Sequence, residues 1–142
     1  MIESIRRANA AQACMTLFAG QPMDWATRCH CGRLAAQAMM RMGRNAKLLN
    51  ACRATTVRGV LTYLKRNKFA DLVELMDATG LERIAPAMAR PGDIVALPSA
   101  PGDGFGCSLT VALSDGRVLM ASELSGLFEP VTPHVFVAAW RV

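Results

Sequence analysis

The 142-residue sequence contains no apolar run of roughly 18 residues, so no segment is predicted to cross a membrane as a helix. Dense charge is also missing: 19% of residues are charged and 52% are hydrophobic, which argues against intrinsic disorder. Near the N-terminus, Asn9 and Gln12 interrupt any apolar signal core, so we expect a mature helix there rather than a secretion signal. Length and composition together predict a single domain over residues 1–142 with a packed core.

Acidic residues are scarce in the first half of the chain. Residues 1–70 hold twelve lysines and arginines against two acids, whereas residues 71–142 hold four against nine. A basic half can meet nucleic acid or an acidic protein face. The arginines are spread singly and few aromatic residues there look exposed. We therefore expect solvated helix faces or a protein interface, and nucleic-acid binding is the less favoured reading.

The chain has five cysteines, an odd number, at positions 14, 29, 31, 52 and 107. A chain of this size and apolar content does not need disulfides to hold its core. We expect reduced thiols in a protein made in the cytoplasm.

Hydrophobic periodicity predicts helices in the first half and strands in the second. The expected helices are residues 2–18, residues 31–42, a third helix capped by Thr55 or Thr56, and residues 71–78. The expected strands are 94–97, 108–113, 117–121, 127–129 and 135–140. This pattern predicts an α+β fold in which a helical part, about residues 1–90, packs on one face of an antiparallel sheet, about residues 91–142. Trp140 is expected to pack the last strand on the helices.

Cys31 is the main candidate for chemistry. It follows a turn-like connector that contains Trp25, and it opens a predicted helix. Free backbone N–H groups and the helix dipole stabilise a thiolate at such a position, and cysteine peptidases place their nucleophile there. A nucleophile also needs a base within hydrogen-bond reach. The alternative is a buried structural thiol, since free cysteine is among the most buried residue types.

The order of motifs around Cys31 resembles a known family. The motifs are Trp25-Ala26-Thr27 followed by His30-Cys31, Arg90-Pro91-Gly92-Asp93-Ile94-Val95, Gly126-Leu127, and Ala139-Trp140-Arg141-Val142. They resemble NlpC-type cell-wall cysteine peptidases, a papain-like group, and more closely an NlpC-like family encoded in phage and prophage tail modules. The resemblance covers nearly the whole chain and implies a papain-like fold with Cys31 in the place of the nucleophile.

The departures from that family concern its catalytic groups. His30 stands where the family usually has an aspartate before the cysteine. Counting back from the Asp115-Gly116 hairpin turn places Ser108 where active members carry the histidine base. Serine cannot act as a general base near neutral pH. His30 and His134 would need an unusual geometry to serve Cys31, so we expect a catalytically degenerate member rather than an active enzyme.

A metal site is a further alternative. Cys29, His30 and Cys31 offer two thiolates and an imidazole, but zinc sites usually use separated pairs such as Cys-x-x-Cys, and iron–sulfur clusters need four thiolates. A complete site would need Cys14, Cys52, Cys107 or His134 brought close. We expect no cofactor, with a metal- or iron–sulfur-stabilised adaptor kept as an alternative.

These observations lead to two main hypotheses about function. In the first, the chain is a structural or assembly component of a phage tail tip or baseplate. It would be made in the bacterial cytoplasm and assembled into the virion tail beside hub or distal tail proteins, in a multimeric assembly. In the second, it is a cysteine peptidase that uses Cys31 on the peptides of peptidoglycan.

Overall fold

The computed structural model describes residues 2–142 and has two layers, one of helices and one of strands. Its helices are α1 (Glu3–Phe18), α2 (Cys31–Arg41), α3 (Lys47–Asn50), α4 (Val57–Arg66), α5 (Leu72–Ala78) and a 3-10 turn, η1 (Pro86–Met88). Its strands are β1 (Glu82–Ile84), β2 (Ile94–Leu97), β3 (Ser108–Ala112), β4 (Val118–Ala121), β5 (Phe128–Val131) and β6 (Ala138–Arg141). The α+β class expected from the sequence is confirmed.

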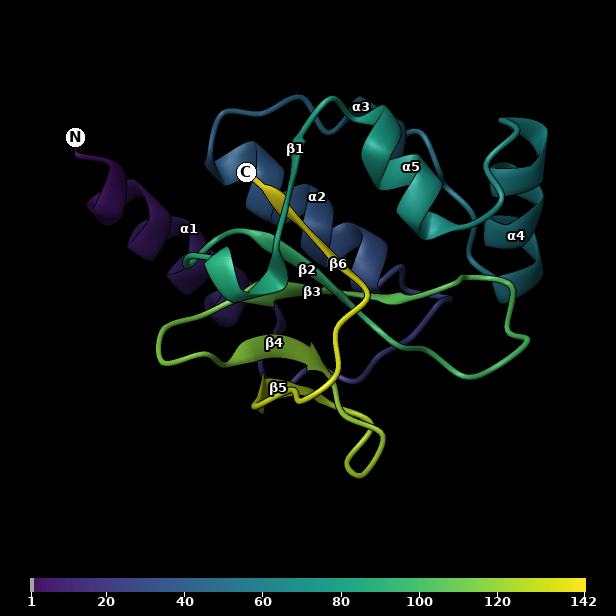
Figure 1. Ribbon diagram of the computed structural model, residues 1–142. Helices are drawn as coiled ribbons and strands as arrows, with labels where there is room; N and C mark the ends of the chain where they lie inside the picture. The colour runs from purple at the N-terminus through teal and green to yellow at the C-terminus, as the bar shows by residue number, and fades with distance from the viewer. Residues whose placement is uncertain (1) are drawn as a thin grey trace.

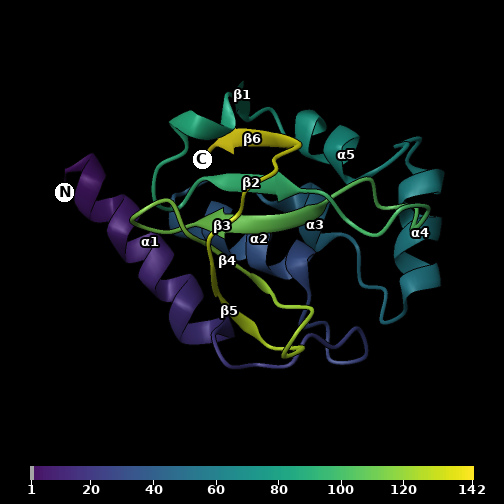
Figure 2. The ribbon, with the colours of Figure 1, turned by 60° about the horizontal axis from the view of Figure 1, so that its bottom comes forward.

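The strands form one antiparallel sheet in the order β1-β6-β2-β3-β4-β5. Helices α1 and α2 lie behind the sheet, and α3, α4 and α5 lie toward one end of it (Figure 1). The chain between β5 and β6 crosses the opposite face on its way back to the sheet, as Figures 1 and 2 show from two directions. In residues 2–142, no helix is both long and apolar enough to span a membrane.

The main predicted elements are present, and capping side chains explain where two helices start. The hydroxyl of Thr56, rather than that of Thr55, caps α4 by accepting a 3.0 Å hydrogen bond from the backbone N–H of Gly59. The Asp71 carboxylate caps α5 by accepting a 3.0 Å bond from the N–H of Glu74. Trp140 is fully buried and packs against α5 residues in the main core cluster, which confirms its predicted role.

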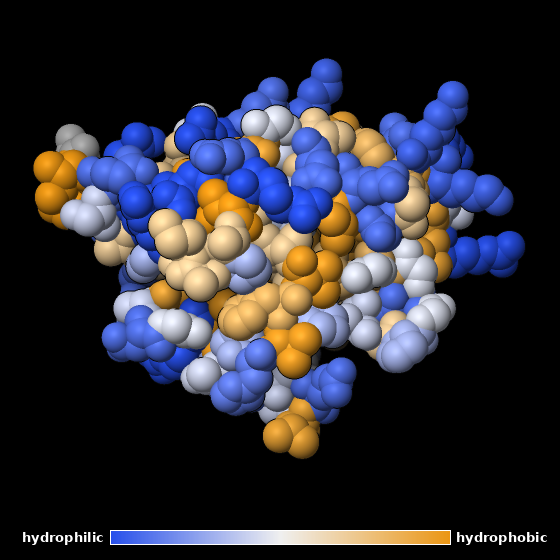
Figure 3. All heavy atoms as spheres, in the orientation of Figure 1, coloured by the Kyte–Doolittle hydropathy of each residue, from blue (hydrophilic) through white to orange (hydrophobic). Residues whose placement is uncertain are grey.

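The edges of the sheet differ from the prediction. The last strand starts at Ala138 rather than at residue 135, because Val135, Phe136 and Val137 belong to the crossing segment and are exposed. Apolar side chains gather over this face of the molecule (Figure 3). Strand β1, which pairs with β6, was not predicted, so the sheet draws on residues before 91 as well. The four-residue helix α3 was also not predicted.

The register between β2 and β3 fixes which side chains face the helices. Ala96 pairs with Leu109 and Ile94 pairs with Val111, and these residues belong to the core clusters that include α2. Leu97 pairs with Ser108, and Leu97 belongs to the cluster on the other side of the sheet. Because side chains alternate along a strand and directly paired residues share a face, Ser108 faces away from α2.

A buried ion pair ties the two ends of the chain to the central strand β2. The guanidinium of Arg7 in α1 lies 2.7 Å from the Asp93 carboxylate and donates a 3.0 Å hydrogen bond to the carbonyl of Val142. Asp93 is completely buried and also accepts bonds from the backbone N–H groups of Val142 and Arg90, both at 2.9 Å. Arg141 lies 3.1 Å from its second oxygen. The first helix, the start of β2 and the last residue therefore meet at one carboxylate.

The turn before Asp93 depends on glycine. Gly92 has φ +89°, a conformation that L side chains rarely adopt, and a Cβ there would lie 3.6 Å from the backbone carbonyl oxygen of Arg7. The Pro91-Gly92-Asp93 turn thus places Asp93 directly against α1.

We predict that Asp93→Ala lowers the free energy of unfolding by about 3–5 kcal/mol, because it leaves the Arg7 guanidinium buried without its counter-ion. Urea unfolding followed by circular dichroism measures the change. Glu3→Ala is the matched control: it removes the exposed partner of the same arginine and is expected to cost no more than about 0.5 kcal/mol. Equal losses in the two variants would contradict the central role of Asp93.

Candidate functional site

Cys31 lies at the first position of α2, and a tight connector delivers it there. Asp24 and Cys29 exchange backbone hydrogen bonds of 2.8 and 2.9 Å, which closes a short loop just before the helix. Arg28 has φ 61° at the end of that loop, and its guanidinium donates a 3.2 Å bond to the carbonyl of Cys52. The loop is thereby held against the chain that follows α3, and its geometry sets the direction in which α2 begins.

The Cys31 thiol sits between the first turn of α2 and strand β3. Burial raises its pKa above the ordinary value, and hydrogen bonds from the backbone N–H groups of Leu109, Cys31 and Gly32 oppose that rise without cancelling it. The Asp103 carboxylate raises the pKa further. The helix start thus provides the donors that a thiolate needs, but burial keeps the sulfur protonated at neutral pH.

His30 is the N-cap residue of α2, and this role occupies its one basic nitrogen. Nδ1 accepts a 3.2 Å hydrogen bond from the N–H of Gly32, so the proton of the neutral ring is on Nε2. Burial, followed by the nearby cations Arg28 and Arg33, lowers the pKa of His30 to about 4. A neutral imidazole whose acceptor nitrogen caps the helix cannot take the proton of Cys31 without giving up the cap.

Two aromatic rings enclose the same corner of the molecule. Trp25 stacks on His30 with 4.8 Å between ring centroids and on Phe105 with 5.5 Å, so the indole lies between the other two rings. The three residues line a narrow cavity of about 30 Å³ beside Cys31. Such a volume holds one or two water molecules at most, so this conformation leaves little room for a substrate beside the thiol.

The structure does not bring the Ser108 side chain to Cys31, because Ser108 points to the opposite face of the sheet. The residue beside it, Cys107, is 1% exposed and belongs to the same core cluster as Leu109, on the α2 side. Burial raises the pKa of Cys107 to about 12, and the neighbouring Cys31, Asp71 and Asp103 raise it as well. The side chain of β3 that Ser108 would have provided is thus turned away from Cys31, and the side chain of the preceding residue, which lies near Cys31, is a second thiol.

His134 does not reach Cys31 either. It is exposed in the segment between β5 and β6, which crosses the face of the sheet opposite α2. The sheet separates it from the thiol.

The Cys-His-Cys tripeptide does not converge on one point. Cys31 packs against the main core cluster and Cys29 against the cluster formed by α1, α2, β3, β4 and β5, while His30 caps the helix. Within residues 2–142, no group of three or more His, Cys, Asp or Glu side chains is arranged to hold a metal ion. All five cysteines are free thiols.

The fold and site define an α+β domain with a cysteine at a helix start, preceded by a histidine that caps the helix. The family model described as a domain of unknown function, DUF6950, matches residues 5–142, and the chain belongs to that family. No curated protein and no solved structure matches the chain.

We predict that His30 stays neutral down to about pH 4, which NMR titration of its ring resonances measures directly. Since its folded pKa lies below the ordinary 6.5, the unfolded chain binds a proton first as pH falls. Its contribution to stability is complete above pH 6.5 and declines toward pH 4, by about 3 kcal/mol at most. His30→Asn keeps a capping acceptor but cannot titrate, so the difference between the two pH–stability curves isolates the imidazole. Coincident curves would contradict the assignment.

We predict that native Cys31 reacts slowly with iodoacetamide at neutral pH, at least about tenfold slower than in the urea-unfolded chain, because the thiolate is the reactive species. A Cys29→Ser/Cys52→Ser variant leaves Cys31 as the remaining half-buried thiol, and mass spectrometry locates the label. The rate should rise as pH increases above neutral. A fast reaction that is already maximal at neutral pH would show an activated nucleophile instead.

Proposed function

We propose that this chain is a non-catalytic structural or assembly component of a phage tail tip or baseplate, built on an NlpC-like domain that has lost its catalytic base. The observation that carries the proposal is the surroundings of Cys31. The thiol keeps its place at the start of α2 against β3, but Cys107 occupies the position that faces it and His30 is used as a helix cap.

The electrostatics of the site support the loss of chemistry. Cysteine catalysis needs a thiolate and a base that later returns a proton to the leaving group. Here burial raises the pKa of both thiols, and the pKa of the one nearby imidazole is lowered to about 4. No pair of groups at the site can exchange a proton near neutral pH, so a scaffold role is the simpler use of the domain.

The proposed partners are other tail proteins, such as hub or distal tail proteins, and the proposed route is synthesis in the bacterial cytoplasm followed by assembly into the tail. This part rests on the motif order that resembles phage-encoded NlpC-like proteins. The unequal distribution of charge between the two halves of the chain suits contacts in a multimeric assembly.

A cell-wall cysteine peptidase is the second candidate, and one observation favours it. The backbone N–H groups of Leu109, Cys31 and Gly32 surround the sulfur, as they would if they had to stabilise negative charge there. A peptidase mechanism at Cys31 would need a base from another protein, or a rearrangement that frees His30 from its capping role.

We predict that the purified protein produces no cleared band in a peptidoglycan zymogram and that Cys31→Ala behaves identically. In the phage or prophage that encodes the chain, deleting the gene should abolish infectious particles, and Cys31→Ala should restore plaque numbers to within about twofold. This expectation follows from a thiol that carries no chemistry. Mass spectrometry of purified tails should detect the chain.

Cleavage of peptidoglycan that depends on Cys31 would overturn the structural proposal in favour of the peptidase. Normal tails and full infectivity without the gene would exclude a tail role. Circular dichroism of Cys31→Ala confirms that the variant folds, so that failed complementation reports lost chemistry rather than lost structure.

A further inference from the structure

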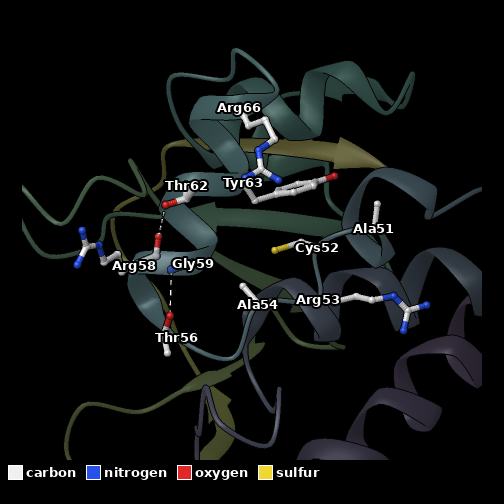
Figure 4. Close-up of a pocket in the computed structure, with 10 residues that line it drawn as sticks. All are labelled: Ala51, Cys52, Arg53, Ala54, Thr56, Arg58, Gly59, Thr62, Tyr63 and Arg66. Atoms are coloured by element: carbon white, nitrogen blue, oxygen red, sulfur yellow. Dashed lines mark hydrogen bonds between the residues drawn. The ribbon is translucent and has the colours of Figure 1, made fainter.

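A hollow of about 510 Å³ lies on the surface between α4 and the chain that joins α3 to α4. Figure 4 shows Cys52, Arg53 and Ala54 on one side of it and Gly59, Tyr63 and Arg66 on the other. It is distinct from the narrow cavity beside Cys31, although Cys52 and Tyr63 line both.

Three arginines surround this hollow and no acidic residue lines it. Arg66 follows Tyr63 by one helical turn, while Arg53 and Arg58 extend outward at opposite ends (Figure 4). All three are exposed, and none takes part in the ion pairs found in residues 2–142. Residues 25–70 as a whole contain ten lysines and arginines and no acid. Hydrophilic side chains project around α4 on the right of Figure 3.

The walls of the hollow are held in place by contacts within the chain. The Tyr63 hydroxyl donates a 2.6 Å hydrogen bond to the carbonyl of Leu48, and the Arg28 guanidinium donates one to the carbonyl of Cys52. A Cβ on Gly59 would lie 2.8 Å from the Cβ of Ala54, so the helix approaches the connecting chain more closely than any other residue type would allow. The arginines therefore lie at the rim of a preformed depression that is also lined by Ala51, Cys52 and Ala54.

We infer that this hollow binds an acidic peptide segment of a partner protein. Carboxylates would pair with the guanidiniums of Arg53, Arg58 and Arg66, and an aliphatic stretch would rest on Ala54 and the ring of Tyr63. Arginine forms bidentate hydrogen bonds with carboxylates, which suits single acidic side chains arriving from several directions.

A nucleic-acid partner fits these features less well. Single strands bind on exposed aromatic rings that stack with bases, whereas Tyr63 is half-buried and its hydroxyl is already bonded. A duplex is bound by cations that follow its backbone, whereas these arginines lie around the rim of one depression. The inference uses charge and shape alone, so it does not depend on the proposed tail role.

The test measures binding of fluorescein-labelled hexaglutamate to the full chain by fluorescence anisotropy at low and high salt. Neutralising the hollow with Arg53→Gln/Arg66→Gln should raise Kd about tenfold, since each exposed ion pair adds a modest factor. Lys65→Gln/Lys68→Gln is the matched control, because it removes the same charge from exposed positions in and just after α4 that do not line the hollow. That variant should change Kd by less than about twofold. Added salt should weaken binding in the wild type.

Cys52 supplies an independent readout, because its half-buried thiol lines the hollow. Saturating hexaglutamate should slow maleimide labelling of Cys52, and Cys52→Ser identifies the signal that comes from this residue. If both double variants raise the Kd of hexaglutamate equally, binding depends only on the net charge of the chain, and the inference is overturned. Absence of binding at low salt would overturn it too, as would tighter binding of an oligothymidylate of equal charge.

Discussion

The buried contact between Arg7 and Asp93 joins helix α1, the start of β2 and the end of β6 at one point. A buried charge is tolerated only with a partner and further hydrogen bonds, so Asp93 must receive Arg7 and the terminal backbone together. This requirement places α1 against the start of β2 and draws the end of β6 to the same point. Helix α2 packs against both α1 and β3, so the place of Cys31 follows from a contact far from it in the sequence.

The alternation of side chains along β3 then decides which groups can reach the thiol. A shift of one residue moves a side chain to the other face of the sheet, so Ser108 and Cys107 have different environments although they are adjacent. Ser108 shares its face with Leu97, and Cys107 lies on the face that α2 covers. The backbone donors around Cys31 belong to the fold, whereas a general base for the thiol would depend on a single side chain.

The sequence predicted long and strongly patterned elements well. Helices α1, α2, α4 and α5 and strands β2, β3 and β4 follow the hydrophobic pattern, and Thr56 was one of the two threonines predicted to cap α4. Strand β1 and helix α3 are too short, at three and four residues, to show a period. Val135, Phe136 and Val137 look like a strand because they are apolar and β-branched or aromatic, but their surroundings override that propensity.

The candidate site was less predictable for a physical reason. The position of Cys31 at a helix start could be inferred locally, but the partner that faces it depends on the register between β2 and β3, which tertiary packing sets. The capping role of His30 depends on its extended backbone, with φ −144° and ψ 174°, and local sequence does not fix that conformation. One feature of the sequence indicated the arginine-lined hollow: residues 25–70 contain no acid.

Three of the chain's acidic residues are already engaged in contacts that hold the fold together. Asp93 is buried with Arg7, Asp77 pairs with Arg83 and accepts from Trp140, and Asp71 caps α5. Carboxylates that serve the fold in this way are not available to the cations of α2, α3 and α4. Clustered cations repel one another, and an isolated chain gains nothing from keeping acids out of a long stretch. The uncompensated charge around α4 is therefore better explained by negative charge on a partner than by the stability of this domain.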